Sequence, residues 1–364
     1  MLPLWASVAG KAGWTCPPLA ADPADRADTK QRRPVRHMGR GEVEGAGAPR
    51  VQANARRWLL WGLAGLWLLD GVLQLQPGMF TRALITVVWQ PAAVGQPGWL
   101  TALMDAAMRV AAYHLVSFNA AVALVQLTLG ALLLTGRPAW VRAGLWASLS
   151  FSVIVWVCAQ GLGQVLTGSA SLLAGAPGSV AVYGAIAVLL LLPEGSWGVA
   201  DLPARVGGGF LLLGAVLQLS PPFWTPLGLA QPFGQAYMMP QPASLRAWIG
   251  TAADLAGRWP LTFNAALVAV FAVAGVATLL APRVPVCWAA LVLVFLTWVF
   301  GQDAGMLWSG MATDPNTAPA LCLLLAAGLR APLGRGRLPL AAGPASGPRR
   351  TQAAAPEPRT GSVA

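Results

Sequence analysis

The chain has few residues of the kinds from which catalytic and metal sites are built. Of its 364 residues only 10% are charged, and its two histidines are His37, in an N-terminal tail, and His114. A haem held by two histidines of one chain is therefore excluded, and no nucleophile with a histidine partner can be assembled. The four cysteines have no C-x-x-C spacing, which argues against a disulfide framework or a zinc site.

Long apolar segments dominate the rest of the sequence. Hydrophobic residues make up 56% of the chain, and several uncharged runs approach the ~20 residues that a helix needs to cross a bilayer. This pattern predicts an all-α, polytopic integral membrane protein whose main partner is the lipid bilayer. The formal charge of +11 would suit nucleic acid, but most basic residues lie in the two tails, so no nucleic-acid partner is expected.

We expect eight transmembrane helices. They are predicted near residues 58–75, 113–134, 143–166, 172–192, 206–219, 261–280, 286–308 and 317–329. The expected domains are a disordered basic tail (1–57), membrane repeat 1 (58–193), a linker (194–205), membrane repeat 2 (206–330) and a second disordered basic tail (331–364). No signal peptide is evident at the start, and Met38 is an alternative start of translation to Met1.

The second half of the chain repeats the first. The sequence VLQL of residues 72–75 returns at 216–219, FNAA of 118–121 returns at 263–266, and Gln96-Pro97 is matched by Gln241-Pro242. A motif W-x-x-x-Q-x-x-G occurs at residues 156–163 and again at 298–305. In a helix its three residues would share one stripe, which predicts a tightly packed helix interface.

Basic residues beside the apolar segments predict the orientation of the chain. Arg137, Arg142, Arg205 and Arg283 flank predicted helices on the side that also holds both tails. The positive-inside rule therefore places the N- and C-termini in the cytoplasm, and we expect a prokaryotic cytoplasmic membrane. Because each repeat has an even number of helices, the two repeats would share one orientation.

A long outer segment follows the first helix of each repeat and is predicted to contain an interfacial amphipathic helix that starts after the Gln-Pro pair. In the first repeat Trp99, Leu103 and Val110, together with Leu100 and Ala107, form an apolar stripe. Asp105 with Arg109, and Asp254 with Arg258 in the second repeat, are spaced as i, i+4 ion pairs.

Polar residues inside the predicted helices are the candidate site. Six amides are expected in one layer near the outer surface: Gln74, Asn119, Gln160, Gln218, Asn264 and Gln302. They could line a polar pocket, or they could form interhelical hydrogen bonds worth about 0.6 kcal/mol each.

Two carboxylates, Asp70 and Asp303, break the symmetry, since glycine stands at the equivalent positions. A charge near the bilayer centre costs at least ~2.5 kcal/mol, so both are candidates for a ligand or proton role, although both lie near the outer surface.

The segment ALVQLTLGALLLTGRPAWVRAGL, from residue 123 to 145, is a helix that runs into a short basic turn. Together with a first helix that ends at an outer segment, it resembles the DoxX family of small four-helix membrane proteins, once over residues 58–193 and again over 206–330. That family includes a subunit associated with thiosulfate:quinone oxidoreduction. The resemblance implies a quinone-linked subunit with a redox partner in the membrane or outside it, and it carries over no catalytic residue.

Three functions remain open from the sequence. The favoured one is an accessory subunit, without catalysis of its own, that binds a quinone or a partner on the outer face. The second is a small-solute transporter or channel that uses the polar layer. The third, an intramembrane redox enzyme, is disfavoured because the sequence offers no metal or haem ligands.

Overall fold

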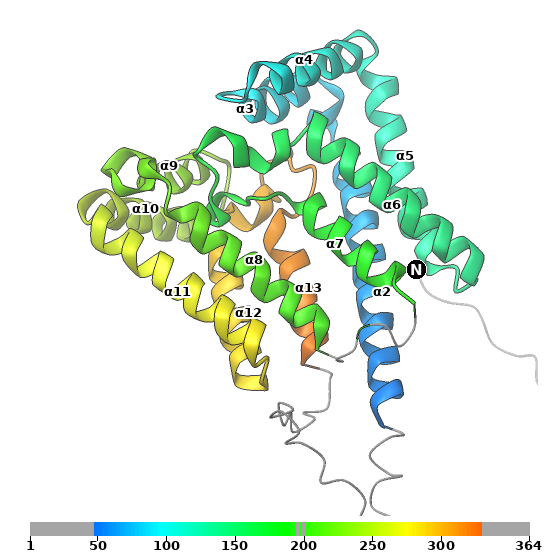
Figure 1. Ribbon diagram of the computed structural model, residues 1–364. Helices are drawn as coiled ribbons and strands as arrows, with labels where there is room; N and C mark the ends of the chain where they lie inside the picture. Colours follow the sequence, from blue (N-terminus) through cyan, green and yellow to red (C-terminus); the bar gives the residue numbers. More distant parts are fainter. Residues whose placement is uncertain (1–46, 194–196, 198–200, 330–364) are drawn as a thin grey trace, which may run out of the picture. The chain divides into compact units, whose positions relative to one another are not determined.

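A computed structural model describes residues 47–193, 197 and 201–329, and its regular structure is helical (Figure 1). The absence of β-strands from these residues confirms the all-α prediction. Both predicted tails lie largely outside the described residues, as does part of the predicted linker. Within the described residues, three helices are long and apolar enough to cross a membrane: α5 (Leu115–Leu134), α6 (Pro138–Cys158) and α11 (Pro260–Leu280).

The elements occur in the same order in the two halves. The first half also contains α2 (Gly47–Leu73), η1 (Pro77–Phe80), the π-helix η2 (Leu84–Trp89), α3 (Gln90–Ala93), α4 (Gly98–Tyr113), η3 (Gly161–Thr167), η4 (Leu172–Ala174) and α7 (Ser179–Leu191). The second half also contains α8 (Leu202–Gln218), η5 (Pro221–Trp224), α9 (Pro226–Tyr237), α10 (Ala243–Arg258), α12 (Val284–Phe300), η6 (Asp303–Met306) and α13 (Thr317–Gly328).

The two halves also pack in the same pattern. Helix α2 packs on α5 and α7, and α6 packs on both α5 and α7. In the second half α8 packs on α11 and α13, and α12 packs on both α11 and α13. The sequence repeat is therefore a repeat of tertiary structure. Helix α13 also contacts α2 and α7 of the first half, so the halves meet there (Figure 1).

Several helix ends differ from the prediction. Helix α2 begins at Gly47, well before residue 58, and α8 begins at Leu202. The early turns of α2 are held in place because Arg56 donates hydrogen bonds to the carbonyls of Leu190 and Leu192, at 2.6 and 3.0 Å. These carbonyls belong to the C-terminal end of α7, where backbone oxygens lack helical partners.

The helices before α5 and α11 begin directly after the two Gln-Pro pairs, as predicted. Helix α4 buries Leu100, Met104 and Met108, however, and leaves Trp99 and Val110 61% and 65% exposed. Of the predicted apolar stripe, Leu100 is therefore buried, whereas Trp99, Leu103 and Val110 face away from the protein. A lipid interface would cover such a stripe, whereas the buried face packs on the rest of the chain.

The predicted ion pairs on α4 and α10 do not form. Within the described residues the salt bridge is between Arg205 and Asp201, at 3.1 Å. An exposed i, i+4 pair gains too little energy to hold two long side chains in a single geometry.

Candidate functional site

The repeated W-x-x-x-Q-x-x-G motif does not continue its helix, which corrects the predicted helical stripe. Helix α6 ends at Cys158 and α12 at Phe300, not at residues 166 and 308. The backbone then turns left-handed, with φ of +64° at Gly163 and +72° at Gly305. Both glycines are therefore part of a turn, a conformation that glycine adopts without steric cost.

The motif holds the loop that precedes the last helix of each half. Trp156 Nε1 donates to the carbonyl of Pro177 at 2.7 Å, and Trp298 Nε1 donates to the carbonyl of Pro315 at 2.8 Å. The two motif glycines face the same prolines. The tryptophan and the glycine together place this loop, and this contact explains why the motif occurs twice.

The glutamines of the motif differ between the halves. Gln160 Nε2 donates to Ser179 Oγ at 2.9 Å, at the start of α7 in its own half. Gln302 Nε2 donates to the carbonyl of Leu172, in the other half, at 2.9 Å. Its Oε1 accepts from the backbone N–H of Ala318 at 3.1 Å. Gln302 therefore joins the two halves.

The loops before α7 and α13 lie against one another. The hydroxyl of Thr317 donates to the carbonyl of Gly175, and the hydroxyl of Ser179 donates to the carboxylate of Asp314. A side chain at Gly175 would collide with Asn316. The junction of the two halves is thus built from residues 175–179 and 313–317.

A cavity of about 290 Å³ opens at this junction. Its polar lining comes from both halves: Gln160, Gln164, Ser169, Ser171, Ser179, Thr313, Asp314 and Asn316. Val87, Met306 and Met311 contribute apolar surface. Ligand pockets commonly have volumes of about 300–1,000 Å³, so this cavity suits a small molecule.

Asp314 is the only charged residue among those that line the cavity in the described part of the chain. It lies in the loop before α13. Burial raises the pKa of its carboxyl group. Hydrogen bonds from Ser179, the Asn316 N–H (2.8 Å) and Thr313 Oγ1 (3.0 Å) act in the opposite direction, because they stabilise the carboxylate.

Four of the six predicted amides pair with one another. Gln74 Nε2 donates to Asn119 Oδ1 at 2.5 Å, and Asn119 Nδ2 donates to the Gln74 carbonyl at 2.8 Å. Gln218 and Asn264 form the same pair, at 2.8 and 3.2 Å. All four side chains are buried and none lines the cavity. Their geometry is that of interhelical hydrogen bonds, the second interpretation of the amide layer.

Asp70 belongs to a buried polar cluster found only in the first half. The side chain is 1% exposed, and Tyr183 donates its hydroxyl to Asp70 Oδ1 at 3.3 Å. Nearby, Trp67 Nε1 donates to Ser148 Oγ at 2.7 Å. The equivalent residues of the second half are apolar: Leu211, Gly214, Ala290 and Leu321. The second half fills this space with hydrocarbon instead of a polar network.

Asp303 lies just beyond the end of α12 and is only 1% exposed. Neither of its carboxylate oxygens has a hydrogen-bond partner in the described residues. Burial raises the pKa of this carboxyl group from 3.8 to about 6. Of the eight predicted site residues, only Gln160 lines the cavity.

Asp314, Ser179, Gln164 and Asn316 were not predicted from the sequence. For Ser179 and Asp314, however, the sequence contains a signal. Each half has a proline shortly after the W-x-x-x-Q-x-x-G motif, and the helix start that follows it begins with Ser179 or Thr317. Extending the repeat to these prolines would have drawn attention to the loop that contains Asp314.

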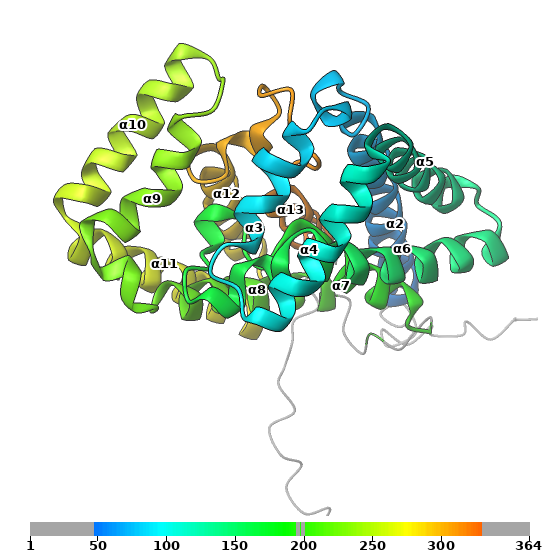
Figure 2. The same ribbon diagram turned by 90° about the horizontal axis from the view of Figure 1, so that it is seen from above.

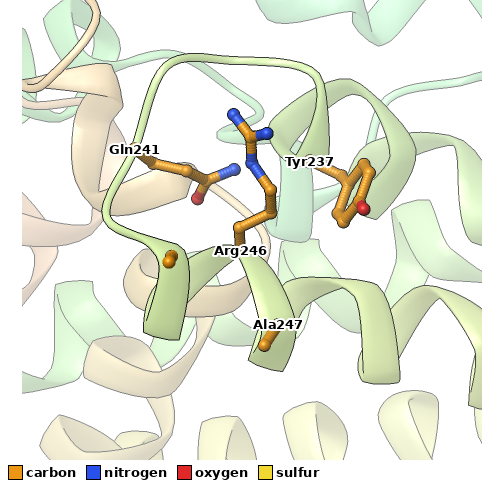
Figure 3. Close-up of a pocket in the computed structure, with 5 residues that line it drawn as sticks. Tyr237, Gln241, Arg246 and Ala247 are labelled. Carbon is orange, nitrogen blue, oxygen red and sulfur yellow. The ribbon is translucent and has the colours of Figure 1, made fainter.

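A second hollow, of about 340 Å³, lies between α9 and α10 (Figure 3). Arg246 stands between Gln241 and Tyr237, with its guanidinium carbon 5.8 Å from the centre of the Tyr237 ring. In the view of Figure 2, α9 and α10 run side by side, away from the junction of the halves. This hollow is formed by one half alone, and the first half has Thr101 in place of Arg246.

No known protein family, curated protein or solved structure matches the chain. The resemblance to the DoxX family therefore rests on apolar spacing and the basic turn alone.

Proposed function

We propose that the chain is an eight-helix integral membrane protein in which two like-oriented four-helix repeats form a ligand site at their outer junction. Helices α5, α6 and α11 meet the length and apolarity of a span, and α2, α7, α8, α12 and α13 complete the two repeats. In this arrangement α7 and α13, of 13 and 12 residues, are shorter than a full span. At ~1.5 Å per residue they cover about two thirds of a ~30 Å hydrocarbon layer, and the irregular loops beside them fill the remaining depth.

The distribution of side chains also supports a bilayer environment. Apolar residues face outward along the candidate spans, among them Leu124 of α5 and Val273 of α11, both exposed. The Gln–Asn pairs and Asp70 point inward. Lipid can cover outward-facing apolar side chains, whereas in water they would form a large exposed apolar surface. Irregular backbone at membrane depth is tolerated only where protein surrounds it.

The observation that carries the function is the junction cavity, to which both repeats contribute polar groups. It suits a binding or accessory subunit that takes up a small molecule from the outer side. The family resemblance names a quinone as one such ligand and a membrane or extracytoplasmic redox protein as the partner. A small-solute transporter is the second candidate, favoured by Asp70, whose Oδ2 is buried without a hydrogen-bond partner among the described residues.

The topology is tested with reporter fusions after Arg137 and Arg283, which precede the third helix of each repeat. Both fusions are expected to report the cytoplasmic side. A fusion placed after Trp99, in the first connecting segment, should report the opposite side and serves as the control. Placement of Arg137 and Arg283 on different sides would contradict like-oriented repeats.

The ligand site is tested by mass spectrometry of small molecules that co-purify in mild detergent. Ser169 is exposed and lines the cavity, so Ser169→Trp is expected to obstruct the site without disturbing the core. Wild type and the control Ser244→Trp, at an exposed position on α10, should retain a molecule that Ser169→Trp loses. Equal recovery from all three proteins would count against the cavity. Counterflow of a labelled solute that depends on Asp70 would favour the transporter instead.

A further inference from the structure

The polar groups of the junction cavity have most of their donors already engaged. Gln160 Nε2 donates to Ser179 Oγ, and Gln164 Nε2 donates to the Ala92 carbonyl at 3.0 Å. The Ser171 hydroxyl donates to Gln218 Oε1 at 2.7 Å. Because an amide nitrogen or hydroxyl with a good protein acceptor gains little from a second one, these groups have little to offer a ligand as donors.

The glutamine side-chain oxygens of the cavity, by contrast, are hydrogen-bond acceptors that lack protein donors among the described residues. Gln160 Oε1 is buried and has no hydrogen-bond partner in the part of the chain that the structure describes. Gln164 Oε1 has no protein donor in the described residues. Asp314 already accepts hydrogen bonds from Ser179, Asn316 and Thr313, but its carboxylate brings a negative charge to the same space. The Asn316 amide caps the N-terminus of α13 through its oxygen, which leaves its nitrogen as the one clear exception. The cavity therefore presents mainly acceptors.

Among the described residues, the lining of the cavity carries negative and no positive charge. The described lining residues include no lysine, arginine or histidine. The carboxylate of Asp314 would attract a cation in the cavity and repel an anion.

We propose that the junction cavity binds a small organic cation that carries N–H donors, such as a primary ammonium with a short apolar chain. This inference rests on the proposed function and specifies the ligand class. The ammonium would donate to Gln160 Oε1 and to the Asp314 carboxylate, a charge-assisted contact. Its carbon chain would contact Val87, Met306 and Met311. An oxidised quinone offers only acceptors and matches this lining poorly. A hydroquinone shares the donor chemistry and lacks the charge.

Calorimetric titration of the full chain in lipid nanodiscs tests the proposal with four probes. They are n-propylammonium, propionate, hydroquinone and benzoquinone. Propylammonium is expected to bind, and Asp314→Asn should weaken it by about tenfold or more. Asp254→Asn makes the same charge change at an exposed position on α10 and should leave the affinity unchanged. Ser169→Trp should abolish binding by filling the cavity mouth, and it keeps the test decisive should Asp314→Asn fold poorly.

Each other outcome overturns a defined part of the argument. Tighter binding of propionate or benzoquinone, lost in Ser169→Trp, would refute the cation and leave the cavity as the ligand site. Binding of hydroquinone that is insensitive to Asp314→Asn would show that donors suffice and that charge is irrelevant. If no probe binds, the proposal of a cationic ligand is wrong. The proposed function is contradicted as well only if Ser169→Trp also leaves the co-purifying molecules unchanged.

Discussion

Alanine at Gly163 is expected to destabilise the protein by about 3 kcal/mol or more, the range of severe packing defects. A Cβ at this position would lie 1.9 Å from the carbonyl oxygen of Pro177, and that oxygen is backbone, which cannot rotate away. The same carbonyl accepts the hydrogen bond from Trp156. Any shift that relieves the collision therefore also breaks the contact that places the loop before α7.

Gly168→Ala is the matched control for this substitution. Gly168 has a similar left-handed φ, +74°, but a Cβ there would meet nothing within 4 Å. Its substitution should cost only the backbone strain, about 1–2 kcal/mol. Thermal unfolding in detergent compares the two variants. Equal losses would show that backbone strain alone, and not contact with Pro177, explains the need for glycine at position 163.

Asp303→Asn is expected to stabilise the protein at neutral pH, by on the order of 2 kcal/mol. The carboxyl group is buried without partners, and its pKa is raised from 3.8 to about 6. The helices packed on η6, α9 and α12, contain no charged residue that could compensate a carboxylate. Asparagine keeps the size of the side chain and is among the residues that best tolerate the local φ of +48°.

The pH dependence of this effect has a definite sign. Because the folded state has the higher pKa, it binds more protons than the unfolded state between pH 3.8 and about 6. The contribution of the protonated Asp303 carboxyl group to stability is complete below pH 3.8 and is lost as the pH rises through about 6. The wild type should therefore lose stability between pH 4 and 7, and Asp303→Asn should lose less.

Unfolding temperatures measured from pH 4 to 8 provide the check. The two proteins should converge near pH 4 and separate above pH 6, whereas Asp254→Asn, at an exposed position, should follow the wild type throughout. A constant offset between wild type and Asp303→Asn at every pH would mean that ionisation of Asp303 is not the cause.

The buried amides were predicted from the sequence, whereas the end of helix α6 was not. Gln74, Asn119 and their counterparts in the second half were predicted to share one polar layer because each is an isolated amide in an apolar helix, but their pairing came from the structure. The expected stripe of Trp156, Gln160 and Gly163 was wrong, because helical spacing says nothing about a helix that stops. What ends α6 is the contact with Pro177, a residue of a later loop.

The sequence by itself determined the helical class, the internal repeat and the positions of the two Gln-Pro helix starts. Apolar run length, repeated words and turn residues are properties of neighbouring residues and can be read locally. Only the tertiary structure decided that Gln160, Ser179 and Asp314 face one cavity. These residues come together because the loops before α7 and α13 contact each other across the junction, and that meeting depends on the packing of both halves at once.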